Sequence, residues 1–103
     1  MTNLRSVVDW VRRSAEADLS TEVICVREPW TEDAEARVVH LDEQGRIPAS
    51  ALDGGYEYFL EATLVLEVLE ALANRSGPSR PGDDCRLLIH YARHDAYPEW
   101  LYA

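Results

Sequence analysis

The strongest constraint on the fold is a nearly uninterrupted apolar segment, YEYFLEATLVLEVLEALAN, at residues 56–74. Its polar residues recur at helical spacing on one narrow stripe, and apolar side chains cover most of the remaining circumference. The stripe consists of Thr63, Glu67, Glu70 and Asn74. Because a single packing surface cannot cover so wide an apolar face, the pattern predicts the central helix of the domain. An alternative is that this helix forms one wall of a homodimer.

The N-terminal segment, residues 2–19, predicts a second, amphipathic helix. Thr2 is of a residue type that caps helices at their N-terminus. Apolar side chains fall on one stripe at helical spacing, and charged side chains face the other way. The stripe consists of Leu4, Val7, Val8, Val11 and Ala15. We expect it to face the core.

Residues 21–47 predict a small antiparallel sheet of two to three strands. The β-branched run VICV, residues 23–26, is typical of a buried strand. The sequence RVVHL, residues 37–41, predicts a second strand that leads into a tight turn at Gly45. Ile47 is expected to begin a brief third strand.

The C-terminal quarter predicts a helix over 84–96, followed by a docked aromatic tail. Aspartates before the apolar run favour a helix start, and Pro98 favours a stop. The run itself, CRLLIHY at 85–91, is also compatible with a strand. Burial of a large apolar side chain contributes about 1.5–3 kcal/mol, so we expect the tail to fold back over the central helix. The side chains expected to dock are Tyr97, Trp100 and Tyr102.

Length and composition place these elements in one α+β domain, residues 1–103. The chain has 103 residues, of which 47% are hydrophobic and 28% charged, the balance of an ordinary folded domain. No apolar window approaches the roughly 18 residues of a membrane span, and no signal-peptide pattern is present. We therefore expect a cytoplasmic protein. Cys25 and Cys85 lack CxxC spacing and lie in apolar runs, which predicts two free, buried thiols.

Charge is distributed unevenly along the chain. The net charge is −9, and residues 28–61 carry nine carboxylates against only Arg37 and Arg46. This excess disfavours direct nucleic-acid binding, which depends on neutralising phosphates. Together with aromatic residues near loops, it predicts a surface that binds a basic protein partner. The residues expected there are Glu28, Trp30, Glu32, Asp33, Glu35, Asp42, Glu43 and Tyr56. A competing interpretation is that aromatic residues such as Trp30 complete a small core.

Motifs for catalysis and cofactors are missing from the sequence. It contains no GxSxG elbow, phosphate-binding loop or dinucleotide fingerprint, so we expect no catalytic residue and no cofactor. His90 and His94 are four residues apart, a spacing that on a helix is compatible with one metal ion. The HExxH pattern is absent, which favours solvent-facing or helix-capping histidines. Apolar or acidic neighbours of the cysteines oppose thiolate formation and disfavour cysteine catalysis.

Three functions are compatible with these patterns. The preferred hypothesis is a non-catalytic interaction protein, such as an immunity or inhibitor protein whose carboxylates take the place of phosphates on a basic partner. The second is a homodimeric structural or regulatory subunit built on the helix at 56–74. The third is a small metal-binding protein or enzyme that uses His90 and His94.

Overall fold

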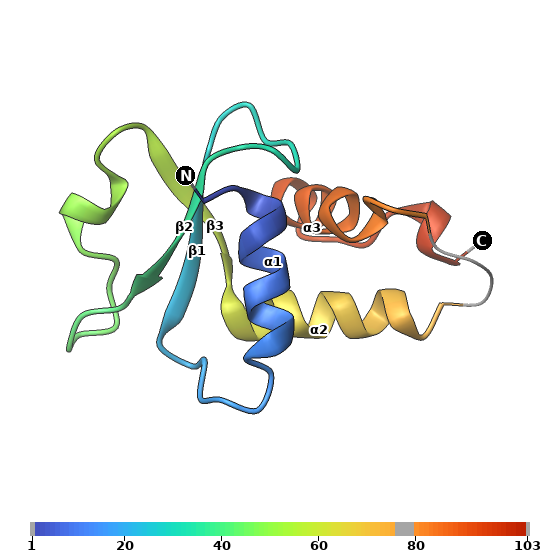
Figure 1. The fold of residues 1–103 in the computed structure, drawn as a ribbon, viewed down its shortest axis with the longest axis horizontal. Coiled ribbons are helices and arrows are strands. Elements are labelled where there is room, and N and C mark those ends of the chain that lie inside the picture. The colour runs from blue at the N-terminus through green and yellow to red at the C-terminus, as the bar shows by residue number, and fades with distance from the viewer. Residues whose placement is uncertain (1, 76–79, 103) are drawn as a thin grey trace.

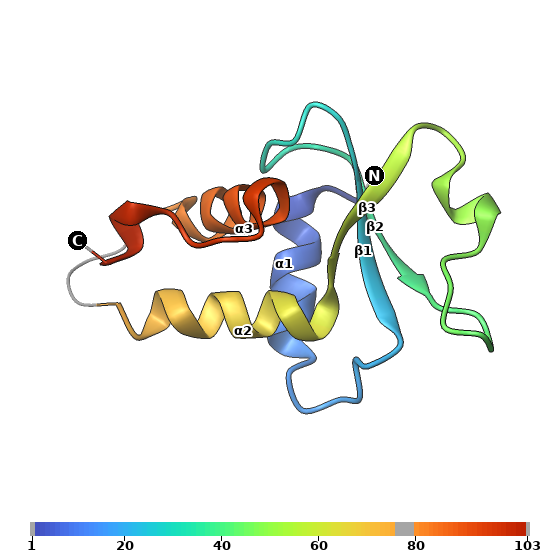
Figure 2. The ribbon, with the colours of Figure 1, turned by 180° about the vertical axis from the view of Figure 1, so that it is seen from behind.

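A three-stranded antiparallel sheet divides the molecule into a helical side and a loop side (Figure 1). The computed structural model describes residues 2–75 and 80–102. The three helices cover one face of the sheet and the segment 41–55 covers the other, as the view from behind also shows (Figure 2). The predicted α+β class is confirmed. The elements are α1 (Leu4–Arg13), β1 (Glu22–Arg27), β2 (Ala36–His40), β3 (Tyr56–Glu61), α2 (Ala62–Ala73) and α3 (Asp83–His94), with 3-10 turns at Ala49–Leu52 and Glu99–Tyr102.

β1 is the central strand and pairs with β2 on one side and β3 on the other. Its Ile24 and Val26 belong to the large core under the helices. Val23 and Cys25 belong to a smaller cluster under the segment 41–55. Since side chains alternate between the two faces of a strand, the predicted apolar run at 23–26 supplies both cores.

The structure corrects the expectation of one helix over 56–74. Tyr56–Glu61 form strand β3, and the helix begins only at Ala62. A bulge in the pairing of β3 with β1 lets two consecutive residues, Phe59 and Leu60, enter the large core. β3 passes into α2 without a loop, so no glycine or proline marks the boundary in the sequence. Pairing with β1 selects the strand for a segment whose aromatic residues favour β structure.

The expectation of a third strand at Ile47 is wrong. After β2 the chain turns at Asp42, whose carboxylate accepts hydrogen bonds from the N–H groups of Gln44 and Arg46, at 2.9 Å each. Gly45 has a φ of +75° and confirms the predicted turn. Ile47 then packs onto the smaller cluster on the loop side of the sheet. Its side chain is partly buried there without strand pairing.

α1 buries the predicted stripe, although its cap lies one residue later than expected. The buried residues are Leu4, Val7, Val8 and Val11. Ala15 lies beyond the end of the helix and is exposed. Asn3 caps α1, because its Oδ1 accepts a hydrogen bond from Ser6 N at 2.9 Å. The carbonyl of Thr2 instead accepts a hydrogen bond from the N–H of Ala36 in β2, at 3.0 Å.

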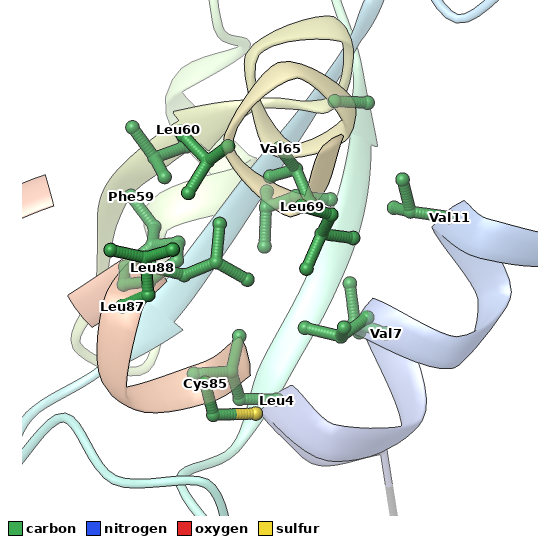
Figure 3. Close-up of a cluster of buried hydrophobic side chains, with 14 of the residues drawn as sticks. Leu4, Val7, Val11, Phe59, Leu60, Val65, Leu69, Cys85, Leu87 and Leu88 are labelled. Carbon is green, nitrogen blue, oxygen red and sulfur yellow. The ribbon is translucent and has the colours of Figure 1, made fainter. Parts of the chain in front are cut away.

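The helices meet over the sheet in one apolar core (Figure 3). α2 buries a single face against it, made of Ala62, Val65, Val68, Leu69 and Leu72. Leu4 of α1, Cys85 and Leu88 of α3, and Phe59 of β3 all belong to this core. Both cysteines are free and buried, as predicted. Among the helices of residues 2–75 and 80–102, none has the length and apolar character needed to cross a lipid bilayer.

The C-terminal tail docks on the helices, but not through all the residues expected. α3 ends at His94, close to the predicted limit, and no strand forms at 85–91. Leu101 is buried, and Tyr97 and Trp100 pack partly buried against the large core. Tyr102 is 75% exposed, so its expected burial is wrong. The aliphatic Leu101 therefore anchors the tail.

Candidate functional site

The candidate site is the acidic loop, residues 28–35, which connects β1 to β2. It contains five of the eight residues predicted to bind a partner: Glu28, Trp30, Glu32, Asp33 and Glu35. Its backbone is fixed at the far end, where Ala34 O and Glu32 O accept hydrogen bonds from Leu4 N and Arg5 N, at 2.9 and 3.0 Å. The loop is therefore docked on the first turn of α1.

Trp30 anchors the middle of the acidic loop. Its indole meets the Phe59 ring edge-on, with centroids 5.0 Å apart. The guanidinium of Arg93 in α3 lies over the indole, 4.6 Å from the ring centroid. Arg93 also pairs with the carboxylate of Glu28 at 3.2 Å. Trp30 thus packs against the core, as the competing interpretation of the sequence proposed, and Glu28 has an arginine partner.

Glu32 joins a network of charges between α1 and α3. It pairs with Arg5 at 3.2 Å, and Arg5 makes two hydrogen bonds to Asp84, at 2.8 and 2.7 Å. Arg12 also pairs with Asp84 at 2.8 Å. Burial opposes ionisation of Asp84, but the hydrogen bonds from Arg5 and Cys85 N and the charges of both arginines outweigh it and lower the pKa to about 2. Asp84 is therefore ionised at neutral pH.

Tyr56 lies at the same end of the sheet as the acidic loop. Its ring is covered by Arg37, whose Cζ is 3.6 Å from the centroid, and its hydroxyl donates to Glu35 at 3.3 Å. Glu35 also pairs with Arg27 at 2.9 Å. The hydrogen bond from Arg27 is the main cause of a lowered pKa for Glu35. These contacts hold both predicted binding residues in defined positions.

A hollow of about 360 Å³ opens in the acidic loop. Among the described residues that line it, Glu28, Asp33 and Glu35 bring three negative charges, and Arg27 brings one positive charge. Asp33 makes no ion pair with the described part of the chain. The hollow is therefore a concave, negatively charged surface of a size that admits a cationic side chain.

The structure separates Asp42 and Glu43 from this site. Asp42 and Glu43 follow β2, whereas the acidic loop precedes this strand. The full length of β2 therefore separates the two carboxylates from the acidic loop. Asp42 also uses its carboxylate to close the turn before Ile47. The acidic residues that the sequence groups together thus lie at opposite ends of the sheet.

The two histidines of α3 and the two cysteines are the remaining candidates for metal binding or nucleophilic chemistry. The rings of His90 and His94 are 4.5 Å apart on α3. In the described ranges, no group of three His, Cys, Asp or Glu residues could hold a metal ion. Burial and, to a lesser extent, the charge of Asp84 raise the pKa of Cys85 to about 12. Burial also raises the pKa of Cys25. Both thiols are therefore protonated at neutral pH and unsuited to nucleophilic attack.

Sequence reasoning missed the arginines that surround the acidic loop. Arg5, Arg27 and Arg93 come from three different elements and each pairs with one of its glutamates. One signal was present, since Asp84 stands at the start of an apolar helix, where a buried carboxylate needs a cationic partner.

No family model, no curated protein and no solved structure matches the chain.

Proposed function

We propose that this chain is a non-catalytic interaction protein whose acidic loop binds a basic protein partner. The observation that supports the proposal is the hollow lined by Glu28, Asp33 and Glu35, where carboxylates outnumber guanidinium groups by three to one. A lysine or arginine side chain that enters the hollow exchanges water for charge-assisted hydrogen bonds. No metal, cofactor or activated nucleophile is needed for this role.

The acidic loop is fixed before any partner arrives. Trp30 packs on Phe59, and the arginines of α1, β1 and α3 position the carboxylates around it. A loop that is already ordered loses little conformational entropy on binding, so more of the interaction energy contributes to affinity. This arrangement favours a specific partner surface over non-specific attraction between opposite charges.

The most specific form of the proposal is an immunity or inhibitor protein. A nuclease or another nucleic-acid-binding protein carries lysines and arginines that neutralise phosphates. Carboxylates held on a rigid loop take the place of those phosphates and cover the same surface. Such a complex associates quickly at low salt and more slowly as salt rises.

The structure supports the homodimer and metal hypotheses less than the acidic loop. α2 is shorter than the helix expected at 56–74, and its buried face is covered within the same chain. The exposed large hydrophobic residues in the described ranges lie on separate segments: Leu52, Tyr58 and Tyr102. His90 and His94 have no third ligand group in the described ranges. We therefore base no second proposal on either.

The test compares two sets of neutralised variants that change the net charge equally. The first set is Glu28→Gln, Asp33→Asn and Glu35→Gln in the acidic loop. The control set is Glu16→Gln, Glu67→Gln and Glu70→Gln, which are exposed positions outside the loop. Each protein is immobilised and used to capture partners from the native host at low salt, and a captured protein is then purified and titrated against all three forms.

The proposal predicts a basic partner whose affinity falls by at least about tenfold for the loop set and little for the control set. Circular dichroism confirms that both sets are folded. Capture of no basic protein, or an equal loss of affinity for the two sets, would contradict the proposal.

A further inference from the structure

A second charged cavity lies at the end of the helical layer, where α2 ends and α3 begins. It has a volume of about 360 Å³, and the described residues that line it are Arg75, Arg80, Asp83, Arg86 and Trp100. Among these described residues, three arginines stand against one aspartate, so their summed charge is positive in a chain whose net charge is −9. In Figure 1 the C-terminal end of α2 is the part of this helix that lies far from the sheet.

The arginine side chains are more available to solvent than the aspartate. The Asp83 side chain is only 10% exposed, and its Oδ2 accepts a hydrogen bond from Arg80 N at 2.8 Å. Arg86 is 59% exposed and reaches Asp83 only at 3.6 Å. The Arg80 guanidinium forms no ion pair with the described residues. The carboxylate of Asp83 therefore accepts a hydrogen bond from the backbone, while Arg80 and Arg86 contribute positive charge to the lining of the cavity.

Trp100 holds one of these cations in place. The Cζ atom of Arg86 lies 4.2 Å from the centroid of the indole. A guanidinium held over an aromatic ring keeps the N–H groups at its edge available for hydrogen bonds to an anion. The docked tail thus gives the cavity a rigid wall and orients a donor group.

We propose that this cavity binds a small phosphate-type anion, either free or carried by a small molecule. A phosphate group bears about two charges and several acceptor oxygens at neutral pH, so it can engage guanidinium groups from two positions at once. A single carboxylate has one charge and matches one guanidinium fork. This site lies apart from the hollow of the acidic loop, and neither proposal depends on the other.

The test uses isothermal titration with pyrophosphate at constant ionic strength, with chloride as the replaced anion. The first variant combines Arg80→Gln with Arg86→Gln. The matched control combines Arg13→Gln with Arg46→Gln, which removes the same charge at exposed positions away from the cavity. Inorganic phosphate, adenosine monophosphate and citrate are titrated separately to distinguish the sources of the anion.

The proposal predicts saturable one-to-one binding of pyrophosphate, weakened at least about tenfold in the cavity variant and unchanged in the control. Equal affinities for phosphate and the nucleotide would indicate recognition of the phosphate alone, and tighter nucleotide binding would indicate an added contact from the base. The proposal is overturned if no anion binds up to about 10 mM, if both variants weaken binding equally, or if citrate binds as tightly as pyrophosphate.

Discussion

The guanidinium of Arg5 and the carboxylate of Asp84 form two hydrogen bonds, at 2.8 and 2.7 Å, across 79 positions of the chain. The pair connects the first turn of α1 to the first turn of α3. Arg5 also binds Glu32, so the acidic loop belongs to the same network. A geometry with two parallel hydrogen bonds fixes orientation more strongly than a single contact. The position of the acidic loop therefore depends on a residue near the C-terminal end of the sequence.

Replacement of Asp84 by asparagine should destabilise the protein at neutral pH. The free energy of unfolding is expected to fall by about 1–3 kcal/mol, because the partly buried guanidinium of Arg5 loses its anionic hydrogen-bond partner. The pKa of Asp84 is lowered from 3.8 to about 2 in the folded state. The carboxylate thus stabilises the fold above pH 4, and this contribution disappears as the pH falls from about 4 to 2.

The difference in stability between wild type and Asp84→Asn should therefore be constant near neutral pH and shrink below pH 4. Urea unfolding at several pH values measures it, and other carboxylates cancel because both proteins contain them. Asp33→Asn serves as a control for loss of an exposed charge. A difference that is the same at pH 7 and at about pH 2.5 would show that the charge of Asp84 is not the stabilising group.

The elements that could be predicted from the sequence are those with a local pattern. The stripe of α1 repeats at helical spacing, and the run at 23–26 consists of β-branched or small apolar residues flanked by polar ones. β3 could not be distinguished from α2 in this way. The strand continues directly into the helix at Glu61 and Ala62. No turn residue separates the two elements, so only the pairing of β3 with β1 distinguishes them.

The candidate site could be predicted only in part, because charge counting along the chain omits partners distant in sequence. The carboxylates of the acidic loop were identified, but the arginine that pairs with Glu28 is 65 positions away. Asp42 was grouped with the loop because it is near in sequence, although β2 separates them. Whether a carboxylate is paired or available is thus a property of the tertiary structure.

Two substitutions in the C-terminal tail test which side chain anchors it to the core. Leu101 is 6% exposed, whereas its neighbour Tyr102 is 75% exposed. Leu101→Ala should lower the free energy of unfolding by about 2–4 kcal/mol, since it removes buried methyl groups and leaves a cavity. Tyr102→Ala should change it by less than about 0.5 kcal/mol. Thermal or urea unfolding compares the two, and a larger loss for Tyr102→Ala would contradict the observed packing.

Trp30 should stabilise the acidic loop through its ring and not through its indole N–H. The Nε1 atom is buried and has no hydrogen-bond partner among residues 2–75 and 80–102, so burial of this N–H group destabilises the folded state. Trp30→Phe keeps an aromatic contact with Phe59 and should change stability by less than about 1 kcal/mol, whereas Trp30→Ala should cost about 2 kcal/mol. Amide exchange across residues 28–35 should accelerate in the alanine variant. Equal exchange in both variants would argue against an anchoring role.

Thiol reactivity should report the opening of the core around Cys85. This thiol is 1% exposed, belongs to the same core as Leu4 of α1 and has a pKa raised to about 12. A thiol reagent therefore reaches the reactive form only when α3 separates from α1. Cys25 serves as a control when studied alone in Cys85→Ala, because its strand lies at the centre of the sheet. Arg5→Gln removes the Arg5–Asp84 pair and also removes a positive charge that lowers the pKa of Cys85. Labelling of Cys85 should accelerate more than that of Cys25 in this variant, and the difference would therefore report opening of the core and not easier thiolate formation. Mass spectrometry of the labelled protein measures both rates under native conditions. Rapid labelling of Cys85 in the wild type, or an equal acceleration at both cysteines, would show that the Arg5–Asp84 pair does not hold the two helices together.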